Sequence, residues 1–366
     1  MNSRLKYILA FICIFVLGAA PTVAAAESSE GGGEEVNVKE LILDHIADAY
    51  EGHISIFGLN VSIPLPVIVK GENSGWHVFS SSNFHHGTAE HNGFYIAQSG
   101  EYRGKVVEKD ASGAEIRPWD FSITKNAFGL LLSSVILVVI ILSAANWYKR
   151  HSKEDDPKVP KGFFGFMELF IMNVNDDIIK PCVGKNYKKF APYLLTAFFF
   201  IFINNIMGLI PIFPFGANVT GNISVTLVLA LFTMVIVNIF GTKEYWKEIF
   251  WPVVPTWLKV PIPIMPAIEF VGILTKPFAL MIRLFANILA GHSIVLGLVC
   301  LIFVTVQLGT AINTSMTVVS VVLTIFIDLV EILVAYIQAY VFTMLSAVFI
   351  GLAQVEPHHS VEKQKH

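Results

Sequence analysis

The residue with the most distinctive chemistry is Arg283, a permanently charged guanidinium within the apolar run 275–292. Charged residues are scarce throughout 190–354, apart from a short connection at 243–259. Holding such a charge at bilayer depth costs roughly 2.5 to 3.5 kcal/mol on insertion scales. A residue of this kind has to face protein or water, and by default it marks a path for an ion or a substrate. Arg283 therefore predicts an ion-translocating membrane protein.

Three charged residues of this region recur at intervals of seven. Glu269, Lys276 and Arg283 share one stripe of a helix, because seven residues turn about 700°, only about 20° short of two full turns. Asn287 follows one turn after Arg283 on the same face. The spacing predicts a polar stripe along an otherwise apolar helix.

The last apolar stretch carries a second polar stripe. Glu331 and Gln338 are also seven residues apart, and Asp328 lies three residues before Glu331. We expect the two stretches to form an antiparallel hairpin with Arg283 beside Gln338. His292 would then lie about 13.5 Å farther outward and Glu331 about 10.5 Å, which is nearly the same depth. A histidine and a carboxylate at one level can carry protons, because their pKa values can be tuned near neutrality.

The rotation of the helix separates His292 from Arg283. Nine residues turn about 900°, so on a straight helix the two side chains point half a turn apart. We expect the arginine to face a partner and the histidine to face an internal aqueous path. Purely structural interpretations exist for Lys276, which can extend its ammonium to the interface, for Glu269 as an interfacial carboxylate, and for Asp328 as the partner of a neighbouring polar group.

Composition bounds the class of protein. The 366 residues are 54% hydrophobic and only 14% charged, which is too apolar for a soluble domain and typical of a polytopic membrane protein. The net charge of −3 gives no electrostatic basis for nucleic-acid binding. The three cysteines are widely separated and suggest neither a disulfide framework nor a metal cluster, so no metal or cofactor is expected.

The fold class predicted is an all-α polytopic membrane protein with about five membrane helices and a small β-rich N-terminal segment. The last two helices are overlong, because about 40 residues span roughly 60 Å, twice the bilayer core. They should form a strongly tilted hairpin. An amphipathic helix over Gly162–Lys180 should lie in the interface, the alternative being a helix on the surface of a soluble domain. The expected spans are Ala127–Trp147, Phe190–Phe213, Asn222–Phe240, Ala267–Val306 and Thr317–Ala353.

The N-terminal part divides into a leader and an extension. Residues 1–26 have two basic residues, an apolar core and an Ala-rich cleavage site, as in a secretory signal peptide, although an uncleaved anchor fits the same pattern. Residues 27–120 form an extracytoplasmic extension, and 121–366 the membrane domain. Within the extension we expect a short helix over Val36–Tyr50 and extended segments, which are Ile54–Val69, Phe94–Ala97 and Lys105–Glu108.

Basic residues set the orientation of the spans. Lys149 and Arg150 directly follow the first span, which places its C-terminal end in the cytoplasm. The N-terminal region is therefore extracytoplasmic, and alternation of the remaining spans places the C-terminus in the cytoplasm. The protein is expected in the inner, or plasma, membrane of a bacterium.

Several ordered motifs resemble subunit a of F-type ATP synthases. The chain reads KPFALMIRLFANILAGH at 276–292 and EILVAYIQAYVF at 331–342. Before these come FAPYLLT at 190–196, NNIMGLIP at 204–211 and NISVTL at 222–227. The similarity covers about residues 125–355, whereas the leader and the extension are absent from most members.

The resemblance implies a non-catalytic stator subunit of the Fo sector of an ATP synthase. It would form two half-channels that carry H⁺ to and from a ring of c subunits, each with a carboxylate at mid-membrane. Arg283 matches the arginine that attracts the ring carboxylate and prevents protons from leaking between the half-channels. Gln338 and Asn287 match its polar neighbours. The implied partners are the c-ring, the b subunits, the F1 headpiece and membrane lipids.

The same resemblance assigns a proton pathway. Glu269 matches a carboxylate of the cytoplasmic half-channel. Asp328 is expected in the pathway from its position alone, three residues before Glu331. Many bacterial members have an acid at the position of His292 and a histidine at that of Glu331. This chain resembles the exchanged, mitochondrial-type arrangement, which keeps the pair.

Three other functions compete with this interpretation. A Na⁺-translocating version of the same subunit would share all these motifs, but histidine binds Na⁺ poorly. A stand-alone secondary transporter would require inverted repeats, which the sequence does not display. A membrane-anchored sensor would use the extension as its receptor but would leave Arg283 unexplained.

Overall fold

The computed structural model describes residues 48–56, 59–71, 75–85, 87–110, 113–151, 160–210, 216, 218–250 and 264–354. The expectations that fall outside these residues are the leader at 1–26, most of the helix expected at 36–50 and the cytoplasmic position of the tail at 356–366.

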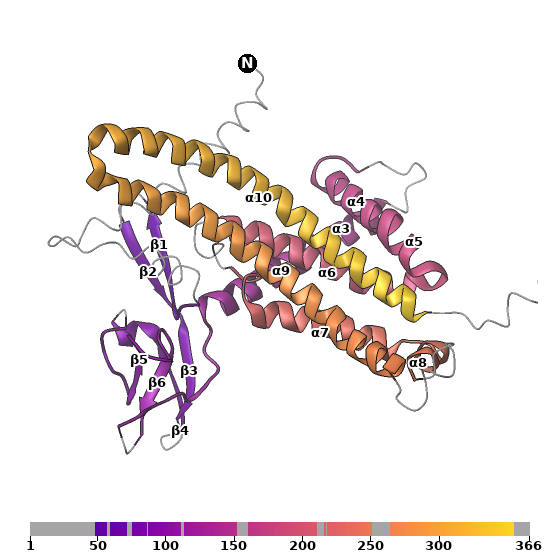
Figure 1. The fold of residues 1–366 in the computed structure, drawn as a ribbon, viewed down its shortest axis with the longest axis horizontal. Coiled ribbons are helices and arrows are strands. Elements are labelled where there is room, and N and C mark those ends of the chain that lie inside the picture. The colour runs from indigo at the N-terminus through magenta and orange to yellow at the C-terminus, as the bar shows by residue number, and fades with distance from the viewer. Residues whose placement is uncertain are drawn as a thin grey trace, which may run out of the picture. The chain divides into compact units, whose positions relative to one another are not determined.

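The N-terminal region contains short antiparallel strands, as predicted (Figure 1). Strands β1 and β2 form a hairpin, β3 lies between β4 and β8, and β6 lies between β5 and β7. The stretch expected to be one extended segment over Ile54–Val69 is divided among three strands, because Pro64 ends one and Pro66 begins the next. The bounds are β1 Glu51–Ile56, β2 Leu59–Pro64, β3 Pro66–Gly71, β4 Gly75–Ser80, β5 Phe94–Ile96, β6 Val106–Lys109, β7 Glu115–Ile116 and β8 Trp119–Asp120.

A small apolar core holds these strands together. Val67 and Val69 of β3 are fully buried, and they belong to one cluster with Phe84, Phe94 and Val106. Alternate residues of β3 face this core, as the two-residue period of a strand requires.

The remainder of the described chain is helical. The helices are α3 Lys125–His151, α4 Phe163–Asn173, α5 Lys180–Val183, α6 Tyr187–Leu209, α7 Ile223–Ile239, α8 Lys243–Phe250, α9 Ile264–Thr305 and α10 Thr310–Ala353. Among the described residues, four helical runs are long and apolar enough to cross a membrane, and α7 with α8, bent by 100°, makes up to five. The predicted fold class is therefore confirmed.

The last two helices are the longest elements, with 42 residues in α9 and 44 in α10, each about 65 Å long (Figure 1). Gly309, with φ of 101°, provides the turn between them. The expected start of the last helix at Thr317 is wrong by seven residues, because the neutral polar residues after Gly309 continue the helix back to Thr310. Pro277 and Gly291 lie inside α9 without interrupting it.

The polar connection expected after the third span instead contains α8, in which Lys247 and Glu244 approach to 3.8 Å at the i, i+3 spacing that supports a helix. The helix expected over Gly162–Lys180 is present as α4 and a following π-helical turn, Val174–Ile179. Its position in a membrane interface stays a prediction.

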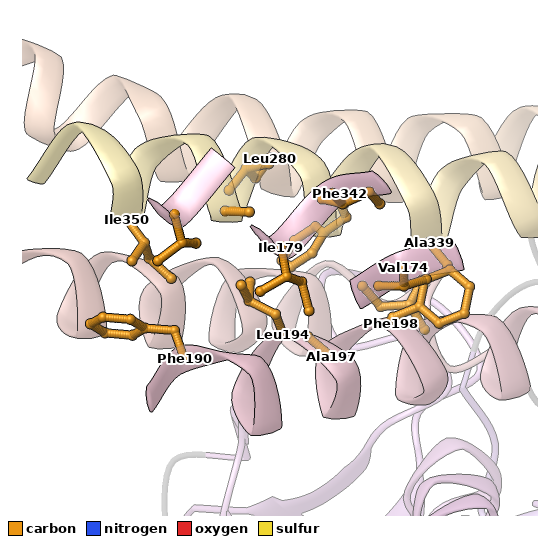
Figure 2. Packing of buried hydrophobic residues seen from close by; sticks show 14 of the residues in the cluster. Val174, Ile179, Phe190, Leu194, Ala197, Phe198, Leu280, Ala339, Phe342 and Ile350 are labelled. Carbon is orange, nitrogen blue, oxygen red and sulfur yellow. The ribbon is translucent and has the colours of Figure 1, made fainter. Parts of the chain in front are cut away.

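The chain groups into two compact units. The first consists of the residues up to Ser134 with Ile206–Val219 and Gly291–Glu331, and the second of Val135–Asn205, Thr220–Ala290 and the residues from Ile332 onward. In the second unit, side chains of α6, α9 and α10 share one buried cluster with the α4–α5 segment (Figure 2). Small residues bring the backbones close, since a methyl group on Gly351 would overlap the Cys182 carbonyl.

Candidate functional site

Arg283 lies on the exposed face of α9 in the second unit. Leu280, Leu284 and Ile288 are buried on the other face of the same helix. Spacings of four residues place these leucines and the isoleucine on one side of the helix, whereas the side chain of Arg283 is exposed. The Arg283 guanidinium has no hydrogen bond or ion pair with any described residue. An exposed guanidinium in this state is suited to attract an anionic group of another molecule.

A pair of amides lies one turn farther along the helices. Asn287 of α9 donates a hydrogen bond of 2.8 Å from Nδ2 to Oε1 of Gln338 on α10. Gln338 is only 3% exposed, whereas Asn287 is exposed. The hydrogen bond places the Gln338 side chain against Asn287, one turn after Arg283 on the same helix. The amides fix the two helices against each other beside the cation.

His292 and Glu331 come together in the first unit. His292 Nδ1 lies 4.0 Å from Glu331 Oε1, and the side chains are 21% and 9% exposed. Among the described residues, this carboxylate oxygen is buried without a hydrogen-bond partner. A buried carboxyl group is either neutral or paired with a charge, and an adjacent imidazole can provide or accept the proton. The contact thus brings together two groups that can each change protonation state.

Gly291 determines where the carboxylate of Glu331 lies. A Cβ atom at Gly291 would overlap the carboxyl group of Glu331. The absence of a side chain thus lets the carboxyl group reach the backbone of α9 next to His292. The signal in the sequence that could have pointed to this role is the glycine directly before His292.

A second polar contact links α6 to α10 in the second unit. Asn205 of α6 donates to the Ala335 carbonyl at 3.3 Å, and Thr220 donates to Asn205 Oδ1 at 2.7 Å. All three residues are buried. The sequence identified Asn205 only as part of a motif and gave no sign of its partners, which are separated from it by 15 and 130 residues.

The remaining predicted residues are half-buried. Glu269 is in the first two turns of α9, and Asp328 lies one turn before Glu331 on α10. Lys276 directs its ammonium over the Phe349 ring at 5.7 Å. Lys276 also lines a small pocket whose polar lining includes Thr233, Asn238 and Tyr245, none of which sequence reasoning had selected.

Two family models match the chain, one in its N-terminal part and one in its helical part. The family model described as ATP synthase A chain matches residues 131–351. A model described as a domain of unknown function, DUF8433, matches residues 41–121.

Individual proteins that are similar to this chain carry names that agree with the larger family match. A protein named ATP synthase subunit a 2 from Chlorobaculum tepidum is 43% identical over 248 residues, which are 65% of this chain and 65% of the relative. ATP synthase subunit a of Chlorobium phaeobacteroides is 35% identical over 92% of this chain and 82% of its own length. The protein of the same name from an Anaeromyxobacter species is 33% identical over 94% of this chain and 77% of its own length. The chain thus spans just under two thirds of the first relative and more of the other two.

Proposed function

The chain belongs to the ATP synthase A chain family, and on this premise we propose that it is the stator subunit of the Fo sector, which conducts H⁺ to and from a ring of c subunits. It performs no bond chemistry itself. Its other partners are the b subunits, the F1 headpiece and the surrounding lipids. Each proton that moves down a potential of 100 mV contributes about 2.3 kcal/mol to ATP synthesis.

Arg283 is assigned to the contact with the ring. Its exposed guanidinium stabilises the ionised form of each ring carboxylate that passes, and so enforces release of the proton. Asn287 and Gln338 hold α9 and α10 in register beside it. The permanent charge also blocks direct transfer between the two half-channels, because a proton is repelled by a cation that cannot be neutralised.

The proton path uses the groups that can change their protonation state. His292 and Glu331, 4.0 Å apart, deliver protons from outside, and Asp328 belongs to the same path one turn away. Glu269 is assigned to release on the cytoplasmic side. The imidazole favours H⁺ over Na⁺ as the translocated ion, because neutral nitrogen is a poor ligand for a hard alkali cation.

The organisation of the whole chain is part of the proposal. Residues 1–26 are a signal peptide, 27–120 an extracytoplasmic extension and 121–366 the membrane domain. The protein lies in the bacterial inner membrane with its C-terminus in the cytoplasm. The basic residues Lys149 and Arg150, in the last turn of α3, support this orientation.

The observation that carries the proposal is the exposed Arg283 on an apolar helix face, without a partner among the described residues. We expect Arg283→Ala to abolish ATP-driven proton pumping, measured as acidification of inverted membrane vesicles. Immunoblots of ring and headpiece subunits establish that the complex assembles.

Lys188→Ala is the matched control, because it removes an equal charge from an exposed position near the start of α6. This variant should pump at the rate of the unaltered complex. Normal pumping by Arg283→Ala would disprove the role assigned to the guanidinium.

A further inference from the structure

One face of the sheet β4–β3–β8 in the N-terminal region is apolar and uncovered. In β3, Val67 and Val69 point into the core, so Ile68 and Lys70 point to the opposite face. Residues paired directly across neighbouring strands point to the same side of a sheet. The register of the strands therefore identifies which side chains share the outer face with Ile68 and Lys70.

Two tryptophans flank Lys70 on this outer face. Lys70 is paired with Trp76 of β4 and with Trp119 of β8. Trp76 is 60% exposed and Trp119 is 73% exposed. The Lys70 ammonium lies 5.9 Å from the centre of the Trp76 ring. The row thus combines two exposed indoles with one cation.

The next row continues the apolar surface. Ile68 is paired with Val78 of β4, and the Val78 side chain is 71% exposed. On the other side of β3, the backbone N–H of Phe121 donates a hydrogen bond of 2.8 Å to the Ile68 carbonyl. Phe121 is 56% exposed, and its ring centre lies 5.6 Å from that of Trp76. We call Trp76, Val78, Trp119, Phe121 and Lys70 the aromatic face.

Between Ser62 and the start of α3, the large hydrophobic side chains whose exposure is described and that are exposed all belong to the aromatic face. Soluble proteins rarely leave such side chains contiguous, and a patch of this kind marks a contact surface. Tryptophan and phenylalanine beside lysine match the interface of a bilayer. There the rings enter the boundary of the acyl chains, and the indole N–H and the ammonium find phosphate and carbonyl acceptors.

The backbone holds this face close to the point where the chain enters the membrane. Phe121 precedes Lys125, the first residue of α3, by four residues, which span at most about 14 Å. Ile123 donates to the Pro66 carbonyl at 3.1 Å, and Lys125 donates to the Ala49 carbonyl at 2.8 Å. Hydrogen bonds thus attach β3 to Ile123, two residues before α3, and the first residue of α3 to Ala49, just before β1.

We propose that the aromatic face docks on the phospholipid headgroups of the leaflet that α3 enters at its N-terminal end. The occupant is the bilayer itself. Continuity with the start of α3 brings the lipid surface within reach, and Lys70 complements the phosphate charge. The extension then lies flat on the membrane and fixes the direction in which α3 enters it.

Spin-label accessibility in the assembled complex tests this docking. A nitroxide is attached at Val78→Cys in a full-length chain whose native cysteines are replaced by alanine, in vesicles of phosphatidylethanolamine and phosphatidylglycerol. Glu101→Cys, an exposed position of the same region outside the aromatic face, is the matched control. We expect the label at 78 to collide more often with oxygen than with a water-soluble nickel chelate, and the label at 101 to show the reverse.

Two results would overturn the proposal. A label at 78 that prefers the nickel chelate lies in water, and a label that neither reagent reaches is covered by protein. Quenching of tryptophan fluorescence by brominated lipids gives a test without any cysteine. The quenched signal should fall in the Trp76→Phe/Trp119→Phe double variant, and an unchanged quenched signal would contradict docking.

Discussion

Arg283 and Glu331 are both ionisable side chains on long apolar helices, and their surroundings differ. Arg283 is exposed on α9, whereas Glu331 on α10 has a side chain only 9% exposed and close to His292. Arginine cannot lose its proton, so its charge has to face a partner or water. A carboxyl group can be neutralised, so it can be buried beside a histidine. Under the proposed function, this difference separates a fixed charge that acts on another molecule from a group that carries a proton.

The strongest test of this comparison measures passive proton conduction in vesicles stripped of the headpiece. Glu331→Gln should lower conduction on the order of 10²-fold, because an amide cannot take up and release the proton as a relay group does. Arg283→Ala should still conduct passively although it cannot pump. Equal loss of passive conduction in both variants would show that Arg283 and Glu331 do not differ in role as proposed.

Exchange of the paired residues gives the next largest effect. His292→Glu combined with Glu331→His keeps one imidazole and one carboxyl group at the same level, so it should conduct more protons than either single substitution. The measurement is the rate of acidification driven by ATP, with assembly checked by immunoblot. A double variant as impaired as the worse single one would show that the two groups do not share a path.

Gly291 offers a subtler test of the same pair. A methyl group there would displace the Glu331 carboxyl group, so Gly291→Ala should lower proton flux by about tenfold, equivalent to about 1.4 kcal/mol. Gly297→Ala is the matched control on the same helix, since its added Cβ meets nothing within 4 Å. Similar flux in the two variants would show that the position of the carboxylate is not critical.

The smallest effect is expected at Asn287, one turn from Arg283 on α9. Asn287→Ala removes the donor to buried Gln338, which costs about 1 kcal/mol or a factor of about five in pumping rate. Thr314→Ala, whose hydroxyl bonds the Thr310 carbonyl of its own helix, is the control and should pump normally. A loss as complete as that of Arg283→Ala would mean that the amide contacts the ring carboxylate itself.

Much of the fold could be predicted from the sequence, because uninterrupted apolar runs of about 20 residues or more have few alternatives to a membrane helix. The errors arose where polarity is a poor guide to backbone conformation. Neutral polar residues after Gly309 continue α10, and the charged residues at 243–250 form α8. In the N-terminal region, the prolines predicted extended structure, but pairing between strands was needed to divide it.

Part of the candidate site could also be predicted from the sequence. A heptad spacing places Arg283 on one stripe with Glu269 and Lys276 whatever the helix packs against. Sequence could not fix the register between α9 and α10, because apolar helices can slide by a turn at little cost until specific contacts form. The hydrogen bond from Asn287 to Gln338 decides that register.

By itself, the sequence determined which residues carry charge, which helices are apolar enough to cross a membrane, and which side chains share a helix face. These properties are local, since they depend on residue type and on the period of the helix. The pairing of His292 with Glu331 was also expected from their depths in the hairpin. Only the tertiary structure decided that the Glu331 carboxyl group lies against Gly291, and that Trp76 and Trp119 stand on one uncovered sheet face. Contacts between residues distant in the chain depend on how elements pack, and no spacing along one segment encodes them.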